Sequence, residues 1–483
     1  MSTTPETYTT LDAADVGQWD LEAEVVVIGL GAAGACAAIE ARAAGADVLV
    51  LERAGGGGGL TSSAAGHLYL GGGTRVQKAC GFEDSVEDMF GYLMSVTPEP
   101  DEAKIRLYCD NSVAHFDWLV AQGVPFNDTF HKAKTVVQLN DECLIWSGNE
   151  EVWPYREEAK AVPRGHKVAM DGHEGGTRLM EVLIARAESL GVRSETDAAV
   201  HSLVRDDTGR IVGVRCKQFD SERTVRASKA VVLATGHFSF NEDMLQAYCP
   251  RLADQRIERQ GGAFDDGAGI QLGLSAGGVA VHMDGFFVTS PFYPPESLLK
   301  GILVNKQGRR YVAEDSYHSR STVFSLEQPD GHVVLIADDA CFGRPEMGGQ
   351  EVIDAWDDVG EMARDLGMPE LEATIDRYNE HAAKGEDPEF HKGPKWLKPL
   401  DTPPYAALQC SYGKAWYTGF TLGGLSTSID AEVLDSAGRP IRGLYAAGAC
   451  ASNIAQDGIG YSSGTCIGEA TFFGRRAGVR AAS

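Results

Sequence analysis

The sequence lacks the features that define several large classes of protein. Its ten cysteines include no C-x-x-C pair, so neither a zinc site nor a thioredoxin-type dithiol is indicated, and we expect no metal site. The most apolar stretch, residues 25–51, is interrupted by Glu40, Arg42 and Asp47 and cannot span a bilayer. Residues 1–20 are polar and acidic, without the basic and apolar regions of a signal peptide. We therefore expect a cytoplasmic protein with no transmembrane segment.

Positive charge is scarce as well. Lys and Arg number 43 against 69 Asp and Glu, which gives a formal net charge of −26 at pH 7. A chain this acidic repels phosphate backbones and anionic lipid headgroups, which argues against nucleic acids and membrane surfaces as partners. Hydrophobic residues make up 43% of the 483 residues and charged residues 23%, which are ordinary globular proportions. The length predicts two or three domains.

Glycine is abundant, and its first cluster lies inside a complete βαβ pattern. Residues 25–28 are a β-branched run typical of a buried parallel strand, residues 35–44 are an Ala-rich helical segment, and residues 46–51 are a second strand. The turn between the first strand and the helix is Gly-x-Gly-x-x-Gly at 29–34, and Glu52 follows the second strand. This combination predicts a dinucleotide site, although a glycine-rich turn without a ligand remains the alternative.

Each part of the glycine turn has a physical task. Gly29 permits the tight turn, Gly31 allows the backbone to approach a pyrophosphate, and Gly34 allows the helix to pack closely on the strand. The start of the helix, at Ala32 and Ala33, offers free N–H groups and a positive dipole to the phosphates. We therefore assign these five residues to the cofactor.

The segment after the second strand favours FAD over NAD. Glu52 is suited to accept hydrogen bonds from ribose hydroxyls, and Arg53 follows it into a run of five glycines at 55–59. A nicotinamide cofactor does not need a further loop of glycines and hydroxyls here, whereas an isoalloxazine ring lies along backbone and takes hydrogen bonds from such groups. The alternative is a flexible glycine linker. The candidate flavin-binding residues of this loop are Thr61, Ser62, Ser63 and Gly66.

Two later strands also end in glycine. Residues 229–236 end in Ala234-Thr235-Gly236, and residues 443–448 end at Gly448. Both resemble the strands that close the flavin site in flavoproteins of the two-dinucleotide-binding-fold type. We therefore expect the FAD site to be assembled from both ends of the chain.

The region between these segments is predicted to be an insertion with its own core. The expected fold is α/β, with a Rossmann-like FAD-binding domain in two parts, residues 1–275 and 399–483, and an inserted α+β catalytic domain at 276–398. Within the insertion, the hydrophobic pattern predicts a hairpin at 302–311 and helix over 349–384.

Together, the βαβ unit, the Ala-Thr-Gly strand, the insertion and the C-terminal Gly-Leu-Tyr-Ala-Ala-Gly resemble the fumarate reductase/succinate dehydrogenase flavoprotein superfamily over nearly the whole chain. The resemblance implies FAD and a substrate held between the flavin and the inserted domain. Fumarate reductases use an arginine as proton donor, and a dicarboxylate needs cationic clamps. Residues 456–466 contain no arginine, and the next is Arg475, which disfavours fumarate. The histidine that binds flavin covalently in some relatives is absent from the hydroxyl-rich loop, because His67 comes too late, so we expect non-covalent FAD.

Two motifs are similar to the 3-ketosteroid dehydrogenases, and most of all to their Δ4-(5α) type. Residues 460–465, Gly-Tyr-Ser-Ser-Gly-Thr, match the Gly-Tyr-x-Ser-Gly-Thr motif of that type. Residues 308–317 match its Gly-x-Arg-Tyr-Val-x-Glu-Asp-x-Tyr segment. The Δ1 type has Pro-Gly after the corresponding tyrosine, where this chain has serines. The resemblance thus implies a 3-ketosteroid substrate, and we expect residues 140–175 to shape its entrance.

Removing two hydrogens next to a ketone requires a base for the α-proton, donors that stabilise the enolate, and a hydride acceptor, which flavin supplies. Our hypothesis gives proton abstraction to Tyr461, with Ser463 as a relay on the same side of a strand-like segment. Tyr317 polarises the ketone or assists the proton transfer. Backbone N–H groups around Gly464 complete an oxyanion-type site, and Gly464 and Thr465 are also expected at the flavin. The alternative for each tyrosine is a core residue with a satisfied hydroxyl.

The leading hypothesis is therefore an FAD-dependent 3-ketosteroid Δ4-(5α)-dehydrogenase of steroid degradation, which forms a 4-ene-3-ketosteroid and passes electrons to an unknown acceptor. A Δ1-dehydrogenase or a flavin-dependent ketosteroid reductase of the same superfamily is the second interpretation. A flavin-bound electron carrier without its own substrate is the third. The oligomeric state stays open.

Overall fold

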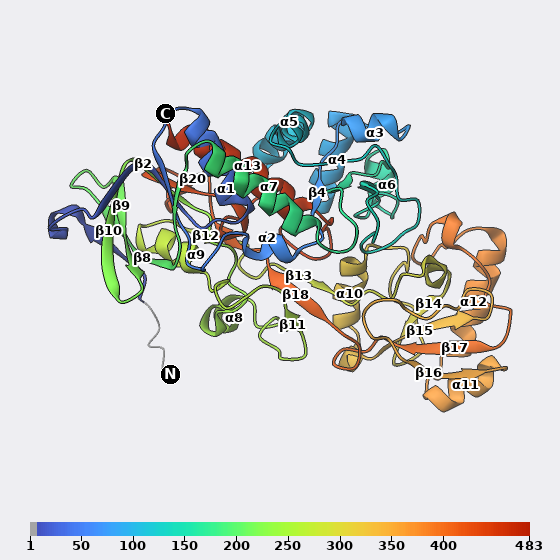
Figure 1. Cartoon of the computed structure of the whole chain (residues 1–483). Coiled ribbons are helices and arrows are strands. Elements are labelled where there is room, and N and C mark those ends of the chain that lie inside the picture. Colours follow the sequence, from blue (N-terminus) through green and yellow to red (C-terminus); the bar gives the residue numbers. More distant parts are fainter. Residues whose placement is uncertain (1–6) are drawn as a thin grey trace.

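The computed structural model describes residues 7–483, which form a larger α/β unit and a smaller unit beside it (Figure 1). The larger unit is built on a nine-stranded sheet whose main path runs β1-β8-β9-β10-β2-β3-β7. At its centre, β2 (Leu21–Ile28) pairs in parallel with β3 (Val48–Leu51) and with β10 (Ser221–Leu233). The β-branched residues of β2 are fully buried, as expected for a parallel strand covered on both faces.

The C-terminal part of the chain completes this sheet. Strand β21 (Pro440–Ala446) pairs in parallel with β10, so the two glycine-ended strands predicted from the sequence are neighbours. The expected α/β fold, with a Rossmann-like FAD-binding domain assembled from both ends of the chain, is confirmed.

Helix α1 (Ala32–Ala43) packs against helix α13 (Thr465–Ala481), and the two lie side by side in blue and red in Figure 1. The contact is close because a Cβ at Gly474 would lie 2.4 Å from the carbonyl oxygen of Ala33, and one at Gly478 would lie 2.2 Å from that of Ala37. Small side chains on both helices therefore hold the last helix of the chain against the first dinucleotide helix.

The smaller unit contains a four-stranded antiparallel sheet in the order β14-β15-β17-β16. Its strands are β14 (Ile302–Asn305), β15 (Val333–Asp338), β17 (Tyr405–Gln409) and β16 (Val352–Trp356), and its longer helices are α11 (Val359–Leu366) and α12 (Leu371–Lys384). This unit has a separate buried core, as the sequence predicted for an insertion.

Two local predictions for the insertion are wrong in detail. The hairpin expected at 302–311 forms only around its turn. The N–H of Asn305 donates to the carbonyl of Arg309 at 2.9 Å and Val304 bridges to Arg310, but the length of β14 pairs with β15. The helix expected over 349–384 begins with strand β16 and is then split into α11 and α12, since Gly367 adopts a φ of 66° that ends α11. Long-range strand pairing overrides the local pattern at both places.

The two units are joined through strand β13 (Phe286–Thr289), which pairs with β18 (Thr418–Thr421) and contacts helix α10 (His318–Leu326). None of the helices between residues 7 and 483 combines the length and apolar character needed to cross a membrane. The other helices and strands are β1 (Thr9–Asp12), α2 (Gly59–Ser63), β4 (His67–Tyr69), α3 (Arg75–Ala79), α4 (Val86–Val96), α5 (Glu102–Ala121), β5 (Leu144–Ile145), α6 (Tyr155–Glu158), β6 (Gly165–Lys167), α7 (Gly175–Ser189), β7 (Arg193–Glu195), β8 (Ala198–Arg205), β9 (Ile211–Gln218), α8 (Glu242–Tyr248), β11 (Glu258–Arg259), α9 (Ala268–Ser275), β12 (Ala280–Val281), β19 (Gly424–Leu425) and β20 (Glu432–Leu434).

Candidate functional site

A cavity of about 410 Å³ lies at the carboxyl ends of β2, β3 and β10, the edge at which open α/β sheets bind their ligands. Its wall contains most of the residues that the sequence assigned to the cofactor. These are Gly29, Gly31, Ala32, Ala33, Glu52, Arg53, Thr61, Ser63, Ala234, Thr235, Gly236 and Gly448.

The glycine turn at the end of β2 fits a pyrophosphate. Gly29 has a φ of 97°, and a Cβ there would lie 2.4 Å from the carbonyl oxygen of Ala234, so the turn tolerates no side chain. At Gly31 the nearest atom to a built Cβ is 3.9 Å away, which leaves this side of the turn open for a ligand. Helix α1 begins immediately after, at Ala32, and its first N–H groups have no partner within the helix.

Glu52 lines the cavity next to the glycine turn. Its Oε2 accepts a hydrogen bond from the N–H of Leu30 at 2.7 Å, and its Oε1 accepts one from the N–H of Ala54 at 2.8 Å. The carboxylate is thereby fixed in orientation while it keeps free lone pairs for ribose hydroxyls. Arg53 forms an ion pair with Asp266 at 2.6 Å and lies over the ring of Phe264, 5.0 Å from its centroid.

Three residues assigned to the cofactor have packing or local roles outside the cavity wall. A Cβ at Gly34 would lie 2.0 Å from the carbonyl oxygen of Gly29, which confirms the close packing of helix on strand but gives no ligand contact. Gly66 lies against another part of the backbone, because a Cβ at Gly66 would lie 2.4 Å from the carbonyl carbon of Gly175. The hydroxyl of Ser62 donates to the carbonyl of Gly59 at 2.9 Å.

Gly464 and Thr465 also lie outside the wall, because they form the start of α13. Gly464 is the residue before the helix and has a φ of 95°, with a built Cβ 2.7 Å from the backbone of Leu68. The hydroxyl of Thr465 donates to the carbonyl of Ser462 at 2.9 Å. The wall on this side is made instead by Cys466, Ile467 and Ala470 from the first turns of the helix.

Several wall residues were not predicted from the sequence. Ala198 and Val200 come from β8, and residues 261–265 come from the loop before α9, where nothing in the local sequence marks a cofactor site. His237 directly follows the Ala-Thr-Gly end of β10, and this position in the sequence is the one signal that could have identified it as a cavity residue. Further unpredicted wall residues are Ala54, Gly56, Gly59, Leu60, Ala268 and Ala449.

His237 carries a buried donor that suits a bound cofactor. Its Nδ1 accepts a hydrogen bond from the N–H of Ser239 at 3.2 Å, so the ring hydrogen is on Nε2. Within the described part of the chain Nε2 has no hydrogen-bond partner, although the side chain is buried and the Oδ1 of Asp265 lies 4.0 Å away. Burial lowers the pKa of His237, which keeps the ring neutral. An orphaned donor, an open glycine turn and a helix N-terminus in one cavity fit FAD.

The two tyrosines predicted to be catalytic meet in one small apolar cluster. Tyr317 is 4% exposed and Tyr461 is 8% exposed, and their ring centroids are 6.4 Å apart. The ring of Phe287 lies 4.7 Å from that of Tyr461. Cys466 packs against this cluster and also lines the FAD cavity, so the phenols adjoin the cofactor site.

The backbone around Ser463 differs from the one we predicted. Residues 461–464 are a loop that turns into α13 and not a strand-like segment. Ser463 acts on Tyr317, because it lowers the pKa of that phenol and so partly opposes the effect of burial. The hydroxyl of the neighbouring Ser462 lies 2.8 Å from the Oη of Tyr92.

Burial determines the acidity of both phenols. Burial raises the pKa of Tyr317, and the hydrogen bond from Ser463 only partly opposes this effect. Burial likewise raises the pKa of Tyr461, with the thiol of Cys466 and the Tyr317 ring adding to the effect. Both side chains are therefore neutral phenols in the resting protein at neutral pH.

The segment at 308–317 contains charged residues that hold it in place, and it ends at Tyr317. Arg310 makes ion pairs with Glu314 at 2.8 Å and with Asp387 at 3.0 Å, and Lys392 lies 3.2 Å from Glu314. All four side chains are buried, so their charges depend on one another and on buried partners such as the carbonyl of Gly301, which accepts from Lys392 at 2.7 Å. This network fixes the chain just before Tyr317 and explains why the segment carries an Arg and a Glu.

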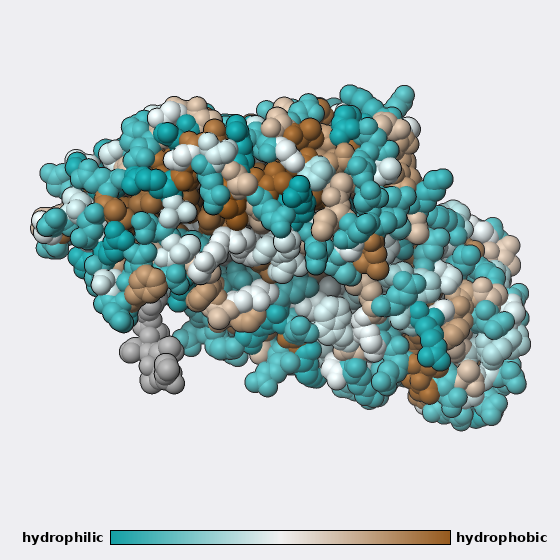
Figure 2. Space-filling view, viewed as in Figure 1, coloured by the Kyte–Doolittle hydropathy of each residue, from teal (hydrophilic) through white to brown (hydrophobic). Residues whose placement is uncertain are grey.

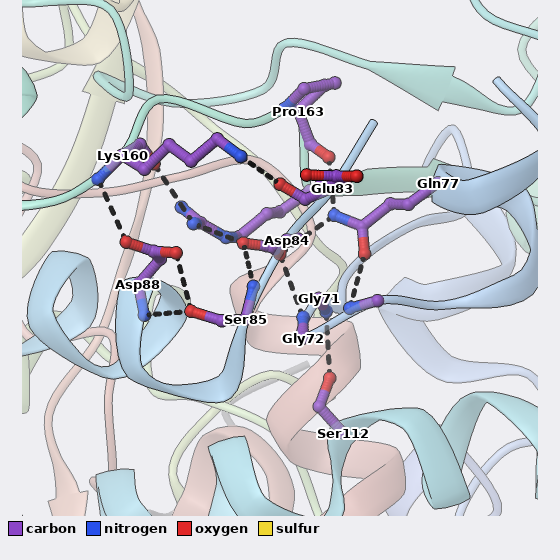
Figure 3. Close-up of polar contacts among 12 residues, drawn as sticks. Gly71, Gly72, Gln77, Glu83, Asp84, Ser85, Asp88, Ser112, Lys160 and Pro163 are labelled. Carbon is purple, nitrogen blue, oxygen red and sulfur yellow. Dashed lines mark hydrogen bonds and ion pairs between the residues drawn. The ribbon is translucent and has the colours of Figure 1, made fainter. Parts of the chain in front are cut away.

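A second buried network surrounds Asp84 (Figure 3), whose side chain and that of Arg164 are fully buried. Asp84 accepts hydrogen bonds from the N–H of Gly72 at 2.8 Å, from Gln77 at 3.0 Å and from Arg164 at 2.8 Å. Burial alone would raise the pKa of Asp84, but the contacts with Arg164 outweigh it and hold this pKa below its usual range. The guanidinium of Arg164 in turn lies 5.6 Å from the ring of Tyr92.

The fold, the position of the cavity and the buried phenols beside it define an FAD-dependent flavoprotein oxidoreductase. The FAD binding domain family matches residues 24–466, and the chain belongs to this family of fumarate reductase and succinate dehydrogenase flavoproteins. The cofactor is accordingly FAD.

Individual relatives support this assignment. The chain is 30% identical to the 3-oxo-5-alpha-steroid 4-dehydrogenase of Comamonas testosteroni over 504 residues, covering 90% of this chain and 94% of that protein. It is 26% identical to the probable fumarate reductase Ifc3 of Shewanella frigidimarina over 475 residues, covering 95% of this chain and 74% of that protein. The solved structure of 3-ketosteroid-delta4-(5alpha)-dehydrogenase from Rhodococcus jostii RHA1, in complex with 4-androstene-3,17-dione, matches with a TM-score of 0.92 and 43% identity over 98% of this chain and all of that one.

Proposed function

We propose that the protein is an FAD-dependent 3-ketosteroid Δ4-(5α)-dehydrogenase, which introduces a double bond between carbons 4 and 5 of a 5α-3-ketosteroid. The observation that carries this proposal is the convergence of Tyr317 and Tyr461 in one apolar cluster beside the FAD cavity. The similarity to the Comamonas and Rhodococcus enzymes supports it.

In the proposed reaction a proton leaves carbon 4, next to the ketone, and a hydride leaves carbon 5. FAD, when bound, supplies the hydride acceptor. Tyr461 is the proposed base for the proton. Because burial raises the pKa of its phenol, Tyr461 must first pass its own proton to a neighbouring group or to solvent, and Tyr317 is proposed to assist this transfer. Positioned proton transfer of this kind typically contributes 10²- to 10⁴-fold to a rate.

Aromatic and apolar side chains surround the two tyrosines, which suits a flat apolar substrate. Phe287 and Phe420 stack at 4.9 Å, and Leu422 is buried beside them. Phe287 comes from β13 and Phe420 from β18, and the two residues meet through the pairing of these strands. Apolar and aromatic walls with few polar groups are typical of small-molecule sites.

We also propose that the chain divides into residues 1–275, 276–398 and 399–483, with the middle segment closing over the substrate. Sheet pairing supports an insertion with its own core. Strand β17 follows the second boundary but pairs with β15 and β16, so the first residues after 398 belong structurally with the insertion.

The proposal is tested by mixing the FAD-loaded protein anaerobically with 5α-androstane-3,17-dione. We expect the flavin absorbance to bleach and the product to be 4-androstene-3,17-dione. A 1-ene product would instead indicate a Δ1-dehydrogenase, and a flavin that no 3-ketosteroid bleaches would indicate an electron carrier. Either result overturns the proposal.

A further inference from the structure

Asn149 joins the two segments that carry the tyrosines. Its Oδ1 accepts a hydrogen bond from the backbone N–H of Tyr317 at 2.9 Å. Its Nδ2 donates to the carbonyl of Ile459, two residues before Tyr461, at 3.3 Å. The side chain is fully buried, so water does not replace these partners.

The backbone around Asn149 is held against the same loop. The N–H of Asn149 donates to the Oη of Tyr92 at 2.8 Å, and this Oη also lies 2.8 Å from the hydroxyl of Ser462. The N–H of Ser463 donates to the carbonyl of Ser147 at 2.7 Å. A Cβ at Gly148 would lie 2.1 Å from the hydroxyl of Ser462, so the contact between these segments is tight.

An amide is the side chain that this position requires. One end must accept a hydrogen bond and the other must donate one, and in a buried site each partner left without a hydrogen bond destabilises the structure. A carboxylate accepts from Tyr317 but cannot donate to Ile459, and an apolar side chain does neither. The rings of Tyr317 and Tyr461 also pack against each other, with 6.4 Å between their centroids.

We propose that Asn149 is a positioning residue that sets the distance and orientation between Tyr317 and Tyr461 for catalysis. The proposal rests on the function proposed above. Proton transfer depends steeply on the placement of donor and acceptor, and a shift of about 1 Å can lower a rate by roughly 100-fold.

The test compares Asn149→Ala and Asn149→Asp with Asn379→Ala in the FAD-loaded protein. Asn379 is a matched control because its Oδ1 accepts from the N–H of Leu400 at 2.7 Å and its Nδ2 donates to the carbonyl of Leu400 at 2.8 Å. It makes the same kind of clamp within the inserted unit, away from the tyrosines. The readouts are kcat and KM for the steroid, the flavin spectrum, and hydrogen exchange of the peptide that contains Tyr317.

We expect Asn149→Ala to lower kcat roughly 100-fold, with KM changed less than about threefold and FAD still bound. Asn149→Asp keeps the acceptor for Tyr317 and loses only the Ile459 contact, so we expect a smaller loss of about tenfold and a well-protected Tyr317 amide. Asn379→Ala should leave kcat within about twofold. A kcat within threefold of the wild type in Asn149→Ala, or a loss of kcat only in step with lost FAD, overturns the proposal.

Failure of the proposed function would be visible separately, as a wild-type flavin that no 3-ketosteroid bleaches. Hydrogen exchange is measured without substrate, so it still tests whether the side chain of Asn149 holds the backbone at Tyr317. Faster exchange at Tyr317 in Asn149→Ala, but not in Asn379→Ala, supports the positioning role, and unchanged exchange overturns it. If Asn149→Ala does not fold, the kcat of Asn149→Asp decides. A loss of about tenfold with FAD bound supports the positioning role, and a kcat within threefold of the wild type overturns it.

Discussion

Tyr317 and Tyr461 place their hydroxyl groups almost out of contact with water, and burial raises the pKa of both. A neutral phenol is a weak base, so the chemistry depends on the short-range partners of each hydroxyl. Ser463 supplies one such partner for Tyr317 and Cys466 supplies one for Tyr461. The reactivity of each phenol therefore depends on the side chain that lies next to its hydroxyl.

Removing either phenolic oxygen is expected to stop turnover and leave the fold intact. Tyr461→Phe and Tyr317→Phe should each lower kcat by about 100-fold or more, because a proton-transfer group is lost while ring packing is kept. The measurement is the rate of anaerobic flavin bleaching by a 5α-3-ketosteroid.

Tyr311→Phe is the matched control for these variants. Tyr311 lies in the same segment as Tyr317, and its hydroxyl bonds to Ser325 at 2.8 Å, away from the cluster. We expect it to cost about 1 kcal/mol of stability or less and to keep wild-type kcat. Full activity in Tyr461→Phe would show that the hydroxyl of Tyr461 takes no part in the mechanism.

Helix α13 connects the FAD cavity, the first dinucleotide helix and the tyrosine cluster. Its first turns line the cavity, its glycines contact α1, and Glu469 accepts hydrogen bonds from the N–H groups of Ile454 and Ala455. At the scale of elements, the placement of this helix links cofactor binding to catalysis.

Gly474→Ala should destabilise the protein and weaken FAD binding. The new Cβ would lie 2.4 Å from the backbone oxygen of Ala33, which forces α13 away from the helix that begins at the glycine turn. Overpacking of this kind costs about 1–3 kcal/mol. The measurements are Tm and the FAD dissociation constant.

Gly91→Ala in α4 is the matched helical control. Its new Cβ would meet the nearest atom at 3.6 Å, an ordinary contact, so the better helix propensity of alanine should leave Tm unchanged or slightly higher. Equal losses of Tm in both variants would contradict the close packing of α1 and α13.

Glu469 gives α13 a pH-dependent contribution to stability. Burial raises the pKa of this carboxyl from 4.5 to about 7, despite the opposing hydrogen bonds from the loop. A raised folded-state pKa means that the contribution is fully present below pH 4.5 and is lost as the pH rises through about 7, a change on the order of 3 kcal/mol.

Glu469→Gln should remove this pH dependence and keep an acceptor for the N–H of Ile454. The free energy of unfolding of the variant, measured by urea denaturation from pH 5 to 8, should rise relative to the wild type as the pH increases. Exposed Glu181 provides the control, and Glu181→Gln should run parallel to the wild type. Parallel curves for Glu469→Gln would show that this carboxyl does not hold a proton in the folded state.

The whole molecule carries a formal net charge of −26, and hydrophilic residues dominate the face shown in Figure 2. Such a field repels anions over a distance that salt shortens from about 30 Å at 0.01 M to about 10 Å at 0.1 M. Charge at this scale acts on the approach of an electron acceptor and not on the fold.

Reoxidation of the reduced flavin by ferricyanide, a trianion, should therefore accelerate several-fold between about 10 and 300 mM NaCl. Neutral benzoquinone is the control and should change less than about twofold. The measurement is stopped-flow reoxidation of the reduced protein. The same salt response for both acceptors would show that net charge does not govern access to the flavin.

The sequence by itself determined the elements whose signals are local. A β-branched run, the glycine turn after it and Glu52 are close together in the chain, and their packing follows from short-range sterics and helix geometry, so they were predicted with their roles. Gly34 shows the limit, because its task in packing was correct but a packing residue does not reach the ligand.

Tertiary structure alone decided which distant groups meet. His237 with its orphaned donor, the pairing of Ser463 with Tyr317, and the bridge from Asn149 to both tyrosine segments join parts of the chain that no local pattern relates. Residues 302–311 likewise have a hairpin pattern, yet β14 pairs with β15, and buried ion pairs hold Arg310 in the loop that leads to Tyr317. The physical reason is that burial and hydrogen-bond partners depend on long-range packing, which local propensity does not encode.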